Sequence, residues 1–186
     1  MVENKKLRLH LGCGSNILEG YVNIDKYIDK IGIRQYDIIK LPYLDGEVDE
    51  IFHQHVIEHL DFHEEKKAFE EWYRILIPGG LLHFDVLDFE WLCQKFLNAN
   101  DNWKQFYNTE DHNYFGNGYN INERWSVLAA HFYGNQAGNG QIHKNMYTEK
   151  KLYRILESYN YKNIYIEKFN YDKFEELQCL RVRANK

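Results

Sequence analysis

The chain has 186 residues, which is long enough for one domain with its own core. Its formal net charge is −5 and its pI is near 6.0. The negative charge argues against a dedicated nucleic-acid binder, whose affinity depends on clustered lysine and arginine. Three widely spaced cysteines do not suggest a disulfide framework, and no apolar run approaches the roughly 18 residues that span a bilayer. We therefore expect a cytoplasmic single-domain protein, without a membrane span, that acts on a small molecule.

The first feature in chain order is a glycine-rich turn after a predicted strand. Apolar and polar residues alternate over 7–11, and Gly12 and Gly14 follow. Because these glycines have no Cβ, a ligand can approach the backbone closely. The next apolar run ends at Asp25, whose carboxylate can accept hydrogen bonds from both hydroxyls of a ribose. This spacing predicts a site for a cofactor that contains adenosine.

Two kinds of cofactor have to be weighed for such a turn. A dinucleotide fold expects G-x-G-x-x-G leading into a helix, with an acid about 20 residues later. Here the third glycine is missing, and Asp25 follows Gly14 by only 11 residues. Segment 16–20 is too short for a helix whose N-terminus could bind a pyrophosphate. A cofactor with a ribose and no phosphate therefore fits better than a nicotinamide dinucleotide.

Strands and helices alternate along the remaining chain. Further strands are predicted at 32–39, 48–56, 81–87, 163–169 and 178–182, and helices at 62–76, 89–97 and 148–158, the last capped by Thr148. An insert at 98–146, with a short helix expected at 123–130, interrupts this order. The alternation predicts an α/β fold with a mostly parallel sheet and helices on both faces. Ligands in such sheets bind at the carboxyl ends of the strands.

Five segments occur in register: Leu9–Gly14, Tyr21–Asp25, Asp37 before Leu41-Pro42, Val48–Leu60 and Leu76–Gly80. In this order they resemble the class I S-adenosylmethionine-dependent methyltransferases. The resemblance implies a Rossmann-like fold with a seven-stranded sheet, an antiparallel last strand, and S-adenosylmethionine as the cofactor. The short connection before Asp25, with Tyr133-Gly134 and His143-Lys144, is similar to small predicted methyltransferases associated with surface polysaccharide or sugar modification.

The resemblance also implies which residues bind the cofactor. They are Gly12, Cys13, Gly14, Asn16, Asp25, Asp37, Gln54 and His55, with Asn16 standing in place of a family glycine. Asp25 would bind the ribose and Asp37 the exocyclic amine of adenine, while Gln54 and His55 would border the methionine end. Asp25 could instead be a turn-forming acid, and Gln54 and His55 could pack beneath the following helix.

The expected catalytic residues are His143, Asp88 and His55. Methyl transfer depends largely on positioning, so a base is optional. His143 follows a flexible glycine pair and has an ordinary pKa near 6.5, which suits removal of a proton from a hydroxyl or amine; it could also be a plain loop residue. Asp88 could orient the substrate or hold the imidazole of His143, and it could equally cap the helix at 89–97.

Residues 55–59 read H-x-x-E-H, which matches an inverted zinc-protease signature. Zinc binding there needs both histidines on one face of a regular helix. Because His55 ends an apolar strand, we expect no metal, and we expect Glu58 and His59 to cap and anchor the following helix.

The sequence thus predicts a methyltransferase whose insert closes over a small polar acceptor, favouring a hydroxyl of a sugar or surface-glycan precursor. Three alternatives stay open: an N-methyltransferase of a small metabolite, a catalytically silent cofactor-binding subunit, and a nicotinamide-dependent reductase. The insert could also support a homodimer, and we expect no nucleic-acid partner.

Overall fold

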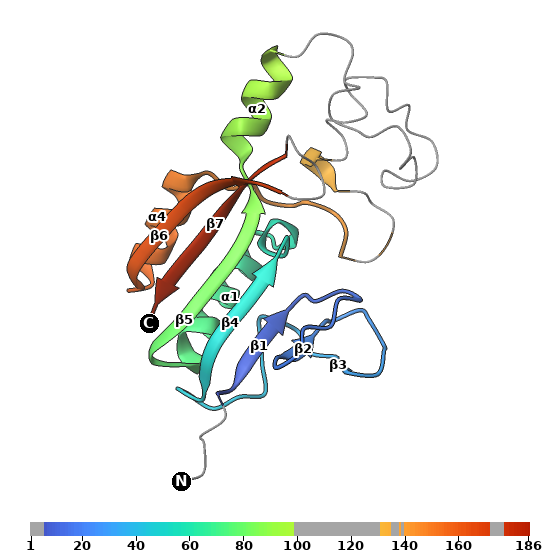
Figure 1. Cartoon of the computed structure of the whole chain (residues 1–186), viewed down its shortest axis with the longest axis vertical. Coiled ribbons are helices and arrows are strands. Elements are labelled where there is room, and N and C mark those ends of the chain that lie inside the picture. Colours follow the sequence, from blue (N-terminus) through green and yellow to red (C-terminus); the bar gives the residue numbers. More distant parts are fainter. Residues whose placement is uncertain (1–5, 99–130, 135–137, 139, 172–176) are drawn as a thin grey trace.

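The computed structural model describes residues 6–98, 131–134, 138, 140–171 and 177–186. Seven strands form one sheet in the order β3-β2-β1-β4-β5-β7-β6 (Figure 1). They are β1 Arg8–Leu11, β2 Val22–Ile24, β3 Ile33–Arg34, β4 Val48–Gln54, β5 Leu76–Leu87, β6 Lys162–Asn170 and β7 Gln178–Asn185. β1 to β5 run parallel, and β7 runs antiparallel to both β5 and β6. The predicted fold class is confirmed.

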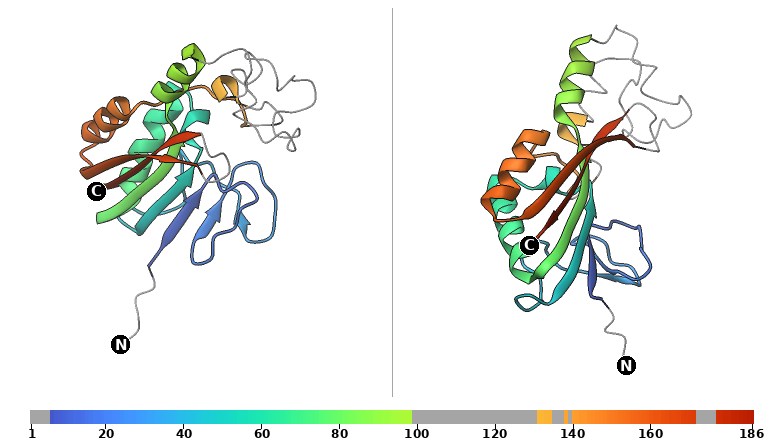
Figure 2. Two further views of the ribbon diagram at one scale, coloured as in Figure 1. Left: turned by 45° about the horizontal axis from the view of Figure 1, so that its top comes forward. Right: turned by 60° about the vertical axis from the view of Figure 1, so that its left-hand side comes forward.

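The described helices are η1 Ile57–His59, α1 Phe62–Ile75, α2 Phe89–Asn98 and α4 Glu149–Ser158. α1 and α4 both pack on one face of the sheet (Figures 1 and 2). Helices were expected on both faces, and in the part of the chain that the structure describes they cover one. None of the described helices is long and apolar enough to cross a membrane. Most of the predicted insert, including the helix expected at 123–130, lies outside the described residues.

The two faces of the sheet differ in chemistry. Under α1 and α4 the strands present fully buried apolar side chains, among them Leu9, Leu11, Ile51, Leu82, Phe84 and Val182. On the other face His10 stacks on Phe52 with ring centroids 5.3 Å apart, and Phe52 stacks on His83 at 4.6 Å. The hydrophobic core therefore lies between the sheet and these two helices, where burial of apolar area stabilises the fold.

A side chain, rather than a helix, organises the short connection between β1 and β2. Asn23 accepts a hydrogen bond from the Leu18 amide at 2.9 Å and donates to the carbonyls of Leu18 and Tyr21 at 3.1 and 3.3 Å. These bonds satisfy backbone groups that a helix would otherwise pair. The connection is a turn, as its length predicts.

Helix α1 begins at a different cap from the one expected. Asp61 accepts hydrogen bonds from the amides of His63 and Glu64, and the Glu64 side chain accepts one from the Asp61 amide, which is a capping box. Glu58 and His59 belong instead to η1, so the expectation that they cap this helix was wrong. The predicted cap of α4 is confirmed, since Thr148 Oγ1 accepts a hydrogen bond from the Lys151 amide at 3.2 Å.

Candidate active site

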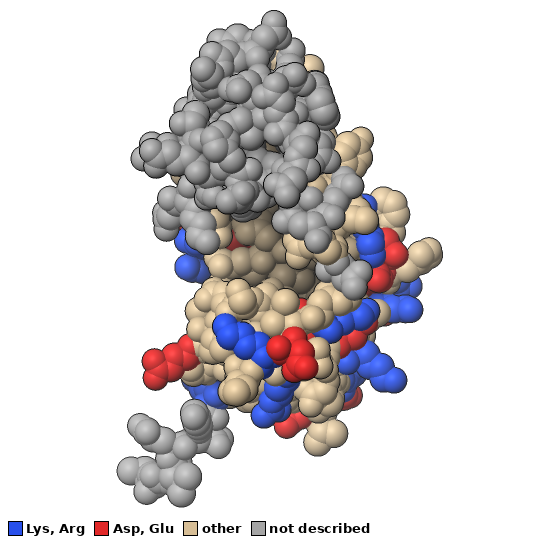
Figure 3. Space-filling view, turned by 90° about the vertical axis from the view of Figure 1, so that its right-hand side faces the viewer, with Lys and Arg blue, Asp and Glu red and all other residues tan. Residues whose placement is uncertain are grey.

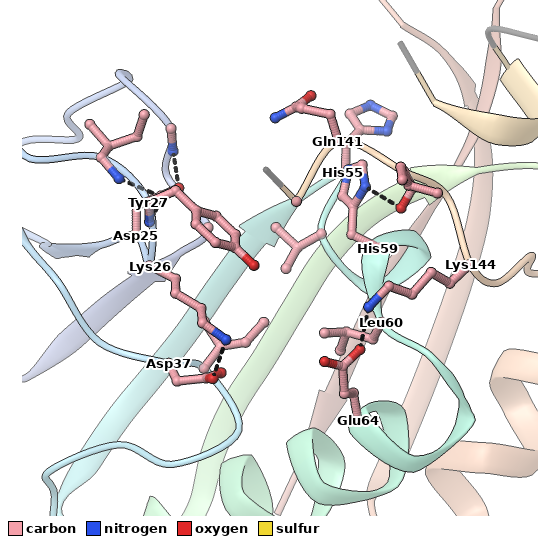
Figure 4. Close-up of a pocket in the computed structure, with 17 residues that line it drawn as sticks. Asp25, Lys26, Tyr27, Asp37, His55, His59, Leu60, Glu64, Gln141 and Lys144 are labelled. Carbon is pink, nitrogen blue, oxygen red and sulfur yellow. Dashed lines mark hydrogen bonds and ion pairs between the residues drawn. The ribbon is translucent and has the colours of Figure 1, made fainter. Parts of the chain in front are cut away.

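A pocket of about 290 Å³ opens at the carboxyl ends of β1, β2 and β4, a volume at the lower end of the range for small-molecule sites. The surface on the side that carries β2 and β3 is hollowed here (Figure 3). One wall comes from the chain after β2 and β3 and bears Asp25, Tyr27 and Asp37 (Figure 4). The opposite wall comes from the end of β4, η1, α1 and residues 140–144.

The glycine turn forms the floor of the pocket. Gly12 has φ +57°, and a Cβ there would lie 2.5 Å from Cγ2 of Val56. Gly14 has φ +53°, and a Cβ there would meet no heavy atom within 4 Å. Both residues adopt a left-handed conformation that favours glycine, and the space beside Gly14 is open. The backbone of the turn can therefore contact a ligand, as predicted.

Cys13 and Asn16 do not line the pocket, although both belong to the same turn. The Cys13 amide donates to the Ile24 carbonyl at 3.0 Å, and the Asn16 amide donates to the Cys13 carbonyl at 2.9 Å. Burial, together with the charge of Asp25, raises the pKa of the Cys13 thiol to about 11. The thiol stays protonated near neutral pH and is a poor nucleophile. These two residues shape the turn through their backbones.

Asp25 connects the glycine turn to the chain that follows β2. One carboxylate oxygen accepts a hydrogen bond from the Gly14 amide at 2.9 Å, and the other accepts bonds from the amides of Tyr27 and Ile28 at 2.8 and 3.2 Å. The turn-forming alternative is therefore realised. Asp25 also lines the pocket, and carboxylate oxygens can accept further bonds. The two roles are compatible in one residue.

Asp37 faces the same pocket and pairs with Lys26. The Lys26 ammonium lies 2.7 Å from one oxygen of Asp37, and this hydrogen bond raises the pKa of Lys26. The other oxygen accepts a hydrogen bond from the Ile39 amide at 3.3 Å. The pair lies in the lower left part of the close-up (Figure 4). Asp37 thus lines the pocket, and its role in binding the adenine amine stays a prediction.

His55 lies at the end of β4 with φ 52°, and its amide donates to the Asp85 carbonyl at 2.9 Å. Its Nδ1 lies 3.0 Å from Oε1 of the buried Glu58. Burial alone would raise the pKa of Glu58, but the hydrogen bond and charge of His55 lower it to about 2. Burial alone would lower the pKa of His55, and its bonds to Cys179 and Glu58 raise it well above its ordinary value. The bonds to Cys179 and Glu58 therefore favour the charged form of His55 on the pocket wall.

Gln54 and Asp88 lie outside the residues that line the pocket. Gln54 donates to Asp85 at 2.8 Å. Asp88 is fully buried, accepts hydrogen bonds from the amides of Glu90 and Trp91 at 3.1 and 3.3 Å, and has its other oxygen 3.0 Å from the Lys168 ammonium. The helix-cap alternative for Asp88 is what the structure shows.

His143 lies one side chain behind the pocket wall. Its Nδ1 donates to the His131 carbonyl at 2.9 Å, and its ring centroid lies 4.9 Å from that of His59, which lines the pocket. The His131 carbonyl takes the position in which Asp88 was expected to hold the imidazole. Burial lowers the pKa of His143, so the ring is neutral near pH 7 and its Nε2 is an acceptor.

Several pocket residues were not predicted. They are Lys26, Tyr27, Ile28, Ile38, Val56, His59, Leu60, Glu64, Gly140, Gln141, Ile142 and Lys144. Lys26 and Tyr27 directly follow the predicted acid, so their position in the sequence could have indicated them. Gly140 could not be placed from periodicity, yet a Cβ there would lie 2.4 Å from Cε2 of Tyr27. The two walls meet at this contact.

Comparisons with known proteins agree with this geometry. Residues 9–84 match the sequence profile of a methyltransferase domain, and no curated protein matches the chain. Many solved structures have a similar fold, among them the following three. An S-adenosylmethionine-dependent methyltransferase from Archaeoglobus fulgidus has a TM-score of 0.61 at 14% identity, with 97% of this chain and 86% of that chain covered. The 1,6-didemethyltoxoflavin-N1-methyltransferase of Burkholderia thailandensis, with bound 1,6-didemethyltoxoflavin and S-adenosylhomocysteine, has a TM-score of 0.61 at 11% identity, with 97% of this chain and 70% of that chain covered.

A possible histamine N-methyltransferase from Thermotoga maritima has a TM-score of 0.58 at 12% identity, covering 97% of this chain and 82% of that one. The sheet order and the pocket at its carboxyl edge define the class as a Rossmann-like α/β fold with a ligand site. With the methyltransferase domain matched over residues 9–84, the chain is a methyltransferase with the fold of S-adenosylmethionine-dependent enzymes, and these findings support S-adenosylmethionine as its cofactor. The predicted enzyme class and cofactor are confirmed.

Proposed function

We propose that the methyl acceptor is a hydroxyl of a small polar molecule, with a sugar or surface-glycan precursor as the favoured class. The observation that carries this choice is the neutral histidine behind the pocket wall. A hydroxyl is a weak nucleophile unless its proton is removed during transfer, whereas a neutral amine can attack directly and lose its proton afterwards. His143, with Nδ1 bound to a carbonyl and Nε2 unprotonated, suits an acceptor of the first kind. The resemblance to sugar-modifying methyltransferases supports the narrower class.

The residues of the pocket fit the cofactor. The open space beside Gly14 lets the backbone approach the methionine part, and Asp25 has acceptor capacity left for the ribose hydroxyls. Ile38 and Leu60 add apolar surface for the adenine, and Asp37 would accept from its exocyclic amine. When bound, the cofactor supplies an electrophilic methyl group on a sulfonium.

The chain's own residues then have separate tasks. The His55 imidazolium would attract the carboxylate of the methionine part at the end of β4. His59 separates the pocket from His143, so the acceptor would lie against His59 with its hydroxyl directed at this histidine pair. The proton would pass by way of His59 to His143 as the methyl group is transferred. Tyr27 and Gly140 would close the pocket over the ligands and exclude water.

A second candidate is N-methylation of a small metabolite. Two proteins of similar fold are named as N-methyltransferases, and the structure of one of them contains bound 1,6-didemethyltoxoflavin. An amine acceptor would depend less on His143 than a hydroxyl would. The dependence of activity on this residue therefore separates the two candidates.

Methyl-labelled S-adenosylmethionine, incubated with a panel of neutral sugars, nucleotide sugars and small amines, tests the proposal. We expect label in a sugar, at least tenfold less product with His143→Ala, and unchanged product with His63→Ala, an exposed histidine of α1. Label only in amines, with no effect of His143→Ala, would favour the second candidate. Cofactor binding without transfer to any acceptor would favour a silent subunit.

A further inference from the structure

Glu58, His59 and His143 form a cluster that the pocket chemistry does not fully use. Each offers one ligand atom, and these three atoms all lie within 4.8 Å of one another. The residues come from η1 and from the segment at 143, which the amides of Lys144 and Asn145 fasten to the Glu58 carbonyl at 2.8 and 3.1 Å. Residues 84 positions apart are thus held together by backbone hydrogen bonds.

The buried carboxylate is only half satisfied. Glu58 is 3% exposed, and while its Oε1 contacts His55, its Oε2 has no hydrogen-bond partner among the described residues. A buried carboxylate oxygen without a partner is costly and calls for an explanation. A cation beside Oε2 would supply one.

Both histidines are oriented as metal ligands commonly are. Nδ1 of His59 lies 3.2 Å from the Ile142 carbonyl, and Nδ1 of His143 lies 2.9 Å from the His131 carbonyl. A carbonyl can only accept, so each Nδ1 carries the proton and each Nε2 is left as a ligand. Such outer hydrogen bonds fix the tautomer and orientation of metal-binding histidines. The orientation of the two rings therefore favours a metal ion that is bound by two imidazole nitrogens.

We propose that Glu58, His59 and His143 bind a divalent transition-metal ion, with zinc as the best match. Two imidazoles and one carboxylate with a free fourth position are a known catalytic zinc set. Donors around tetrahedral zinc lie about 3.4 Å apart, so small side-chain rotations would close the cluster onto an ion. The site uses His59 but not His55, so it differs from the H-x-x-E-H arrangement, and it stands against the sequence expectation of no metal.

The position of the site suggests its task, which rests on the proposed function. His59 lies on the pocket wall, so the open position of the ion would face the acceptor. The acceptor oxygen would bind there, its O–H bond would break with release of the proton to water, and the alkoxide would be held for methyl transfer. In that form His143 acts as a ligand rather than as the base. Ion binding itself does not depend on the acceptor.

Calorimetric titration of the chelator-treated full chain with zinc chloride, without S-adenosylmethionine or acceptor, tests the site. We expect one ion per chain, affinity reduced at least tenfold by His143→Ala and by Glu58→Gln, and no change with His63→Ala. Cobalt in place of zinc should give the absorption of a tetrahedral site in the wild type and in His63→Ala, and not in His143→Ala.

Thermal unfolding guards against a folding artefact, because Glu58→Gln also removes the contact with His55. Zinc should raise the melting temperature of the wild type and of His63→Ala, and not that of His143→Ala. Equal zinc affinity in wild type and His143→Ala, or no saturable binding, would overturn the proposal. Since no cofactor or acceptor is present, this failure is distinct from a failure of the proposed methyl transfer.

Discussion

Replacing Asp25 with asparagine tests the centre of the cofactor site. The asparagine oxygen could still accept from the amides of Tyr27 and Ile28, which Asp25 now binds at 2.8 and 3.2 Å. Its NH2 group would then face the Gly14 amide, which now donates to Asp25 at 2.9 Å. Two donors would oppose each other, and the negative charge would be lost.

The expected loss of affinity follows from the bonds that change. A hydrogen bond to a charged group contributes about 1.5–3 kcal/mol. Asp25 would give two such bonds to ribose, and asparagine could keep a weaker form of one. We expect S-adenosylmethionine binding to weaken by about 3 kcal/mol, or roughly 100-fold. The opposed donors at Gly14 would also lower the free energy of unfolding by about 1–3 kcal/mol.

Calorimetric titration with S-adenosylmethionine, S-adenosylhomocysteine and NADH measures this effect. Both sulfur compounds should bind the wild type and lose affinity together in Asp25→Asn. NADH should bind neither protein, because the described connection after β1 offers no helix N-terminus to its pyrophosphate. Asp29→Asn, an exposed acid of the same connection that does not line the pocket, is the matched control. A folded Asp25→Asn protein whose affinity lies within threefold of the wild type would refute the assignment of this carboxylate to the ribose.

Two further predictions concern the turn and the buried ion pair. In urea denaturation, Gly12→Ala should lower the free energy of unfolding by about 1–3 kcal/mol more than Gly14→Ala. Both variants place alanine at a positive φ, but only Gly12→Ala adds a methyl group 2.5 Å from Val56. Equal losses would contradict this reasoning. The folded pKa of His55 lies above 6.5 and that of Glu58, about 2, lies below 4.5. The pair's stabilisation is therefore complete between about pH 4.5 and 6.5, and is lost as the pH rises through the folded pKa of His55 or falls through about 2. The stability difference between wild type and Glu58→Gln, measured with chelator present, should shrink above pH 6.5, and a constant difference would exclude the charged pair.

Much of the fold could be read from local patterns. Alternation of apolar residues placed the strands, and turn and cap residues such as Thr148 placed element ends, because these signals act within a few residues. The cap of α1 was misassigned because the segment at 57–60 forms a separate 3-10 turn before Asp61. Nothing in the sequence pattern separates one such turn from the first turn of a longer helix.

In the site, too, local patterns placed some residues correctly, and residues that depend on long-range contacts were missed. Gly12, Gly14, Asp25, Asp37 and His55 line the pocket as predicted, because each sits at or just after a strand end. The second wall depends on contacts over long sequence distances and was largely missed. Its clearest example is the His143 segment docked on η1, for which no sequence periodicity exists.

Side chains organise the part of the pocket where a dinucleotide fold has a helix N-terminus. This difference explains why the pocket favours S-adenosylmethionine over a dinucleotide. In a dinucleotide fold the turn after the first strand leads into a helix whose N-terminal amides bind phosphate. Here Asn23 holds the shortened connection, and the Gly14 amide donates to Asp25. An amide that already serves a carboxylate is poorly placed for a second anion, and the carboxylate would repel a pyrophosphate while accepting from hydroxyls. The connection between β1 and β2 is short because side chains, and not a helix, organise it. For the same reason the pocket favours a cofactor with a ribose and a sulfonium over one with phosphates.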